Sequence, residues 1–259
     1  MLDVHPPHHT PNTWRDFFIH IATISVGLLI AVGLEQTIEA IHHRHQRHQL
    51  EAQLHDEAQR NLDLVQRNLM LLKVRLDYVN AAIVALNQAS VVQGRISSSV
   101  MPPRPPSQQG ISEPSQTVWA VAKANGTVGL LPEEEAQVYA RLDHEDDELE
   151  KGEADLYRAG SALTSLRLRH GGLSDARLEY FTVLERDALL ERLSDNLSGL
   201  RRVAVLELNE SGACRGVLHG ARTVDEMIRY MVEEGEHSSL QQTLNDLPIR
   251  HKSALEPHP

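Results

Sequence analysis

The stretch Phe17–Leu34, FFIHIATISVGLLIAVGL, decides how this chain is organised. Its 18 residues carry no formal charge, and a helix that crosses a bilayer needs about 20 predominantly apolar residues. A core helix of this length would have a polar face, and a cleavable signal peptide would end in a small-x-small site, which the following EQTIEAIHH lacks. We therefore predict an uncleaved transmembrane helix over residues 17–36, preceded by a disordered arm at residues 1–16 with Trp14 at the membrane boundary.

Three small residues recur every four positions within this span. Thr23, Gly27 and Ala31 form one stripe along the helix, and such stripes let two helix backbones approach closely in lipid. Besides the lipid bilayer, the sequence thus suggests a second copy of the chain as a partner at this face. The alternative is chance, because glycine and alanine are common in membrane spans.

The composition excludes several classes of protein. Aromatic residues make up only 4% of the 259 residues, which suits helices better than sheets. The net charge of −11 argues against a nucleic-acid partner, because phosphate binding needs a basic surface. The single cysteine, Cys214, excludes an internal disulfide framework and a multi-cysteine zinc site.

The remaining chain reads as helices. No glycine or proline occurs from Leu34 to Gln93, so we predict a long juxtamembrane helix over residues 37–90. Its second half carries apolar residues at alternating spacings of four and three, the pattern of a coiled coil or of the inner face of a bundle: Ala58, Leu62, Val65, Leu69, Leu72, Leu76, Val79, Ile83 and Leu86. A Pro/Ser-rich linker follows at residues 91–116.

Residues 117–235 are predicted to form a helical bundle, followed by a flexible tail at residues 236–259. We expect helices near 115–125, from Pro132 to about His170, from a cap at Ser174–Asp175 to about Asn209, and over 223–233. The third of these helices has apolar positions that include Phe181, Leu184, Leu193 and Leu200. The predicted fold class is all-α, with an N-terminal transmembrane helix that continues into a long helix and an antiparallel helical bundle or coiled coil after it.

Histidines cluster directly after the span, at His42, His43, His45 and His48, with His55 beyond. With Glu39 they could bind zinc, copper or nickel, or gain charge between about pH 5 and 7 beside anionic headgroups. The simpler interpretation is a polar juxtamembrane turn, because no metal-binding motif such as H-E-x-x-H is present.

Three other features invite a functional interpretation. The acidic run HEDDELEKGEADLY (144–157) lacks the pattern of a calcium loop and is interpreted as a solvated helix face.

Cys214 with His219 close by in sequence is interpreted as a buried filler rather than a nucleophile. Gly212, Gly216 and Gly220 indicate either a tight helix contact or a loose turn. No fingerprint of a cofactor or of a catalytic nucleophile occurs, and we predict neither a cofactor nor an enzyme.

Two blocks resemble a widespread group of bacterial single-span membrane proteins of uncharacterised function. The first block is the span and its flank, Ser25–Glu39, and the second is Val118–Leu142, in which an aromatic-led helix and a Leu-Pro step precede a long helix. The resemblance implies a single-pass protein of the bacterial inner membrane with a helical C-terminal domain, and it implies no activity. It also implies a periplasmic C-terminal domain, whereas Arg44 and Arg47 after the span slightly favour a cytoplasmic one.

Three hypotheses follow from the sequence. The first is a membrane-anchored helical interaction or scaffold protein. The second is a pH or metal sensor that uses the juxtamembrane histidines. The third, a helical-bundle metalloenzyme, needs paired Glu-x-x-His motifs, of which only Glu39 and His42 have the spacing.

Overall fold

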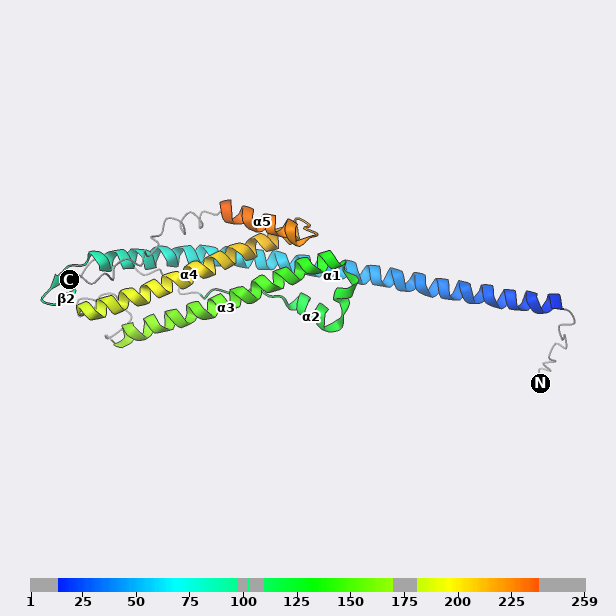
Figure 1. The fold of residues 1–259 in the computed structure, drawn as a ribbon, viewed down its shortest axis with the longest axis horizontal. Helices are drawn as coiled ribbons and strands as arrows, with labels where there is room; N and C mark the ends of the chain where they lie inside the picture. Colours follow the sequence, from blue (N-terminus) through cyan, green and yellow to red (C-terminus); the bar gives the residue numbers. More distant parts are fainter. Residues whose placement is uncertain (1–13, 97–101, 103–109, 170–180, 238–259) are drawn as a thin grey trace, which may run out of the picture. The chain divides into compact units, whose positions relative to one another are not determined.

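The computed structural model describes residues 14–96, 102, 110–169 and 181–237, and these residues are almost all helical, so the all-α prediction is confirmed. Figure 1 shows the elements. They are α1 (Trp14–Gln88), β1 (Val91–Val92), β2 (Arg95–Ile96), α2 (Thr117–Asn125), the 3-10 turn η1 (Thr127–Leu130), α3 (Glu133–Arg169), α4 (Val183–Leu218) and α5 (Val224–His237). The chain divides into two units between Leu50 and Glu51.

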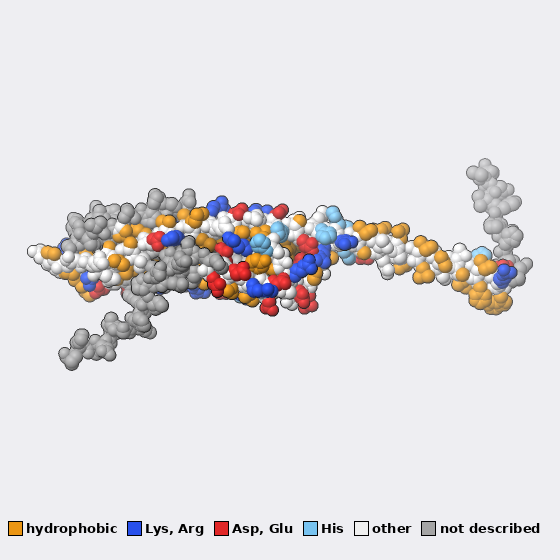
Figure 2. Space-filling view, turned by 90° about the horizontal axis from the view of Figure 1, so that it is seen from above, with side chains coloured by type: hydrophobic (Ala, Val, Ile, Leu, Met, Phe, Trp, Pro, Cys, Tyr) orange, Lys and Arg blue, Asp and Glu red, His pale blue; other side chains and the backbone are white. Residues whose placement is uncertain are grey.

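The first unit contains the apolar part of α1. A window of 18 residues there has a mean hydropathy of 2.3, and none of the window is buried. Its large apolar side chains are exposed, and Figure 2 shows side chains of this kind in orange on the face in view. Thr23 Oγ1 donates to the carbonyl of Ile19 at 2.9 Å, so this hydroxyl is satisfied within the helix. The helix is long and apolar enough to cross a membrane.

In the second unit, residues of α1 after position 50 pack with α3 and α4. Seven of the nine predicted heptad residues of α1 are buried, and Leu69 and Ile83 pack partly buried against the same core. A Cβ on Gly199 would lie 3.3 Å from Leu156, and one on Gly152 would lie 3.6 Å from Val203. Going along α3 from Gly152 to Leu156, the contacts move back along α4 from Val203 to Gly199. The helices α3 and α4 therefore run antiparallel.

The helix α4 begins and ends later than its sequence suggests. The predicted cap at Ser174–Asp175 lies outside the described residues. The observed cap is Thr182, which forms a capping box with Glu185, so Leu184 falls in the first turn and is 81% exposed rather than part of the core. At the other end α4 continues to Leu218, through Gly212 and Gly216.

Glycines let α5 pack closely on this last part of α4. A Cβ on Gly212 would lie 2.4 Å from the Cα of Met231, and one on Gly216 would lie 3.2 Å from the Cα of Met227. Of the two alternatives for these glycines, the structure shows the tight helix contact. Gly220 differs, because it has φ +78 just beyond the helix end, where glycine is favoured.

A short hairpin follows α1, although the sequence indicated no strands. Val91 pairs with Ile96 and Val92 with Arg95, and the turn uses Gln93 and Gly94, both with positive φ, as a tight hairpin turn requires. The amide of Ile96 donates to the carbonyl of Phe181 at 2.9 Å, which connects the hairpin to the start of α4. The described part of the following connector, residues 110–116, leads into α2.

Candidate functional site

Three buried polar side chains of α1 hold the connector in place. Asn61 donates to the carbonyl of Ser115 at 2.9 Å and accepts from its amide at 3.0 Å. Asn68 makes the same pair of bonds with Ser112, at 2.8 and 3.2 Å. In each pair of bonds one asparagine side chain satisfies both the amide and the carbonyl of one connector residue, as a neighbouring strand would.

The third of these side chains caps α2. Both carboxylate oxygens of Glu57 accept from the amide of Val118, at 3.1 and 3.2 Å. Because Val118 lies in the first turn of α2, this negative charge lies at the positive end of the helix dipole. The connector and α2 are thus fixed to one face of α1 by residues at spacings of four and seven.

Behind the connector lies a cluster of two buried and two half-buried acidic side chains, which we call the carboxyl cluster. Its members come from α3 and α4 and are Asp146, Glu153, Glu207 and Glu210. Glu207 and Glu210 are completely buried, and one oxygen of each, Oε2, has no hydrogen-bond partner. The other oxygen of Glu207 accepts from Asn68 Nδ2 at 2.8 Å, so the cluster contacts the side chain that holds Ser112.

Burial raises the pKa of each member of the carboxyl cluster. The pKa of Glu207 rises to about 8 because of burial, and the charges of Glu153 and Asp146 add to the effect while the bond from Asn68 opposes it. The pKa of Glu153 rises to about 7 through burial and the charges of Glu113 and Glu150. These groups therefore exchange protons near neutral pH.

Asp146 and Glu210 form a carboxyl–carboxyl pair. Burial raises the pKa of Asp146 to about 6, while the polar side chains of Gln116 and Glu210 lower it. Burial and the charge of Asp146 raise the pKa of Glu210 well above its usual value. As ionised groups they would repel each other, and a hydrogen bond between them requires that one holds a proton.

A small cavity of about 180 Å³ opens on the outer side of the carboxyl cluster. Asp146 and Glu153 contribute to its wall, so two members of the cluster border this cavity. The remaining lining comes from the connector and from the acidic part of α3: Glu113, Pro114, Gln116, Asp143, Asp147, Leu149 and Glu150.

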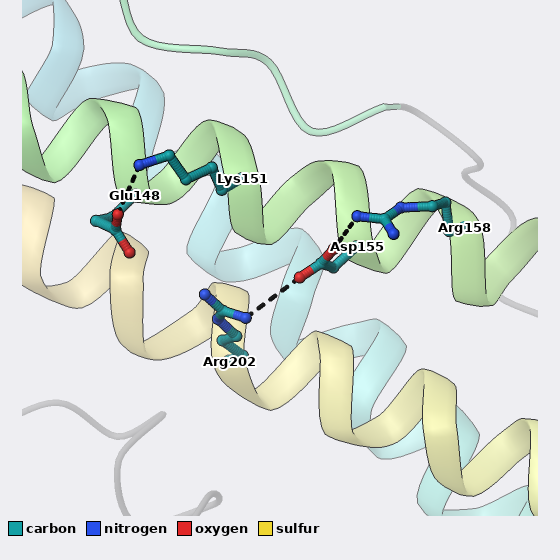
Figure 3. A network of polar contacts seen from close by, with 5 residues as sticks. All are labelled: Glu148, Lys151, Asp155, Arg158 and Arg202. Atoms are coloured by element: carbon teal, nitrogen blue, oxygen red, sulfur yellow. Dashed lines mark hydrogen bonds and ion pairs between the residues drawn. The ribbon is translucent and has the colours of Figure 1, made fainter.

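The acidic run of α3 is only partly the solvated face predicted from sequence. Its outer side bears exposed ion pairs, in which Glu148 meets Lys151 and Asp155 meets both Arg158 and Arg202 (Figure 3). Its inner side is buried: Glu145 is 4% exposed and pairs with Arg141. Sequence reasoning treated both sides alike and missed the inner one.

Cys214 and His219 do not form a catalytic pair. The thiol of Cys214 is completely buried and donates to Glu210 Oε1 at 3.3 Å. Burial and the neighbouring carboxyls raise its pKa, which opposes thiolate formation. His219 is exposed, and its ring stacks on Tyr230 with centroids 5.4 Å apart.

The juxtamembrane histidines lie exposed on α1. His43 Nε2 is 4.0 Å from Glu39 Oε1, and His45 Nε2 is 3.0 Å from Gln49 Nε2. His55 bonds the carbonyl of Leu218 at 3.2 Å, which satisfies a free carbonyl at the end of α4. Among the described residues, no group of three or more His, Cys, Asp or Glu is arranged to hold a metal ion.

Comparison of the chain with family models, curated proteins and solved structures gives no match. The resemblance carried by Ser25–Glu39 and Val118–Leu142 therefore stays a prediction. The carboxyl cluster and the connector contacts define the candidate site by their geometry alone.

Proposed function

We propose that the protein is a membrane-anchored helical interaction or scaffold protein. Residues 17–36 cross the membrane, α1 continues beyond it, and the helices after position 50 form an antiparallel bundle that meets partners. One observation supports the membrane anchor: an uncharged helical segment has a mean hydropathy of 2.3 and none of it is buried. Exposure of such an apolar surface to water is unfavourable. The heptad core of α1, α3 and α4 supports a self-contained domain.

The anchor is tested by alkaline carbonate extraction of membranes that contain the full chain. The variant L28R/L29R places two charges in the span, each costing about 3 kcal/mol at the bilayer centre. We expect the wild type to stay in the membrane pellet and the variant to be released. The matched control is Y157R/L184R, which changes two equally exposed apolar side chains of the helical domain and should stay in the pellet. Release of the wild type, or equal release of both variants, contradicts the proposal.

Self-association through Thr23, Gly27 and Ala31 is tested separately, by crosslinking and sedimentation in detergent. G27L fills the small-residue stripe and should lower the dimer fraction. G33L adds the same bulk on another side of the helix and serves as the control, since neither glycine has a neighbouring atom within 4 Å. A wild-type protein that sediments as a monomer, with no crosslinked partner, contradicts the scaffold proposal.

The side of the membrane on which the bundle lies is tested by paired C-terminal topology reporters, one active outside the cytoplasm and one inside. We propose an inner-membrane protein with a periplasmic bundle. A signal from the cytoplasmic reporter contradicts that orientation and leaves the anchor intact.

A further inference from the structure

Within the part of the chain that the structure describes, the ion pairs next to the carboxyl cluster hold Asp143 and Glu145, and none reaches a member of the cluster itself. Glu207 and Glu210 are completely buried, and each has one oxygen without a partner. The charges that act most strongly on them are those of other carboxyls, Asp146, Glu145 and Glu153. An ionised carboxylate in such a place costs several kcal/mol unless it is paired. The simplest ligand that removes this cost is a proton.

We propose that Asp146, Glu153, Glu207 and Glu210 form a proton-binding site inside the helical domain, and that loss of its protons releases the connector, residues 110–116, and the start of α2 from α1. The site goes beyond the proposed function and does not depend on the membrane anchor. It gives the domain a response to pH that is separate from the juxtamembrane histidines.

Two contacts connect the site to the connector. The first is Asn68, whose Nδ2 donates both to Glu207 Oε1 and to the carbonyl of Ser112, each at 2.8 Å. Movement of Glu207 therefore displaces the group that holds Ser112. The second is Gln116, which lies in the connector, lines the same cavity as Asp146 and lowers the pKa of that carboxyl.

Ionisation also creates repulsion directed at the connector. Glu113 belongs to the connector and faces Glu153 across the cavity wall. Once Glu153 loses its proton, two negative charges face each other there, and like charges at short range destabilise the contact. The other titratable groups around the site are Glu57 from α1, Asp143, Glu145 and Glu150 from α3, and Cys214 from α4. Lys123 pairs with Asp143 and Arg141 pairs with Glu145, so these two cations neutralise neighbouring acids rather than Glu153.

The experiment measures amide hydrogen exchange of the full chain in detergent between about pH 6 and pH 8, corrected for the intrinsic pH dependence of exchange. The reporters are the amides of Ser112, Ser115 and Val118, which donate to Asn68, Asn61 and Glu57. For Glu207 alone, the pKa is about 8 while the connector is bound and returns to its ordinary value of 4.5 when the connector is released. This difference raises the opening constant about 50-fold over this pH range. The amide of Ile96, bonded to Phe181, should keep its protection.

Substitution separates the proton site from general opening. E207Q keeps an acceptor for Asn68 but cannot ionise. The opening constant measured at Ser112 should therefore depend less steeply on pH, by about one proton, which is a factor of about ten per pH unit. The control is E191Q, an exposed acid on the same helix, which should behave as the wild type. E153Q, at a half-buried position, provides a second test should E207Q not fold.

Three results would overturn the proposal. They are corrected exchange at Ser112 that does not change with pH, the same pH dependence in E207Q and E153Q as in the wild type, and protection that requires added Mg²⁺ or Mn²⁺ rather than low pH. The last would replace the proton by a divalent cation. Each outcome is independent of carbonate extraction, which tests the anchor.

Discussion

The contact between α4 and α5 at Gly212 gives a direct test of the packing. A Cβ at this position would lie 2.4 Å from the Cα and 2.9 Å from the amide nitrogen of Met231, and 3.0 Å from the carbonyl oxygen of Tyr230. All three atoms belong to the backbone, so no side-chain rotation can make room. G212A therefore forces α5 away from α4, where Met227 is completely buried.

Two opposing effects set the magnitude. Alanine in place of glycine in a helix interior gains about 1 kcal/mol from helix propensity. Overpacking costs about 1 to 3 kcal/mol, and a rigid backbone contact lies at the upper end. We expect G212A to lower the free energy of unfolding by about 2 kcal/mol. G216A should be nearly neutral, because its nearest atom, the Cα of Met227, lies farther away at 3.2 Å.

The assay is urea unfolding of the full chain in a fixed concentration of detergent, followed by circular dichroism. The matched control is G235A on α5, where a Cβ meets nothing within 4 Å and alanine should stabilise by up to about 1 kcal/mol. Hydrogen exchange of the α5 amides shows whether the helix has separated. If G212A unfolds at the same urea concentration as G235A or a higher one, the close approach of α5 to α4 is refuted.

Three further predictions concern the carboxyl cluster, the connector and the cap of α4. The pKa of Glu207 is raised to about 8 in the folded state, so its contribution to stability is complete below about pH 4.5 and is lost as the pH rises through about 8. Urea midpoints should fall over that range in the wild type, and a midpoint that rises would contradict the burial of Glu207. N61A removes both partners of Ser115 and should cost about 1 to 3 kcal/mol, whereas Q59A, at an exposed site bonded only to Asp63, should be nearly neutral. T182A removes the capping box of α4 and should cost about 1 kcal/mol, which T182S should restore in the same unfolding assay.

The apolar pattern predicted the helices well because burial follows a helical period. The heptad residues of α1 lie in the core, and in α3 the seam continues through Leu142, Leu149 and Leu156. The boundaries were harder to predict, because several residues before Val183 offer caps of similar quality and tertiary contacts decide among them. For Gly212 and Gly216 the sequence left a tight helix contact and a loose turn open, and they are the positions where α5 packs closely on α4.

The carboxyl cluster was missed because its members are acidic, and an acidic residue is usually assigned to the surface. A usable signal was present in two places. Glu145 takes the position in the α3 seam where an apolar residue would continue the pattern, and Glu207 interrupts the apolar run from Val203 to Leu208 in α4. The partners of Asn61 and Asn68 could not be predicted, since the residues of the connector that they bind are distant in sequence and have no pattern of their own.

Polar groups in the core also fix how the helices align. Heptad packing is nearly unchanged when one helix slides along another by seven residues, because apolar side chains then meet apolar side chains again. Asn68 breaks this equivalence, since it lies opposite Glu207. A shift of seven residues along α4 would place it opposite Leu200 or Cys214, and its amide would be buried without that partner. The cost of such a buried amide, about 1 to 3 kcal/mol, opposes every shifted arrangement and favours the one in which Asn68 reaches Ser112. The same side chain therefore sets the alignment of α1 with α4 and the position of the connector, and a proton lost from Glu207 acts on both.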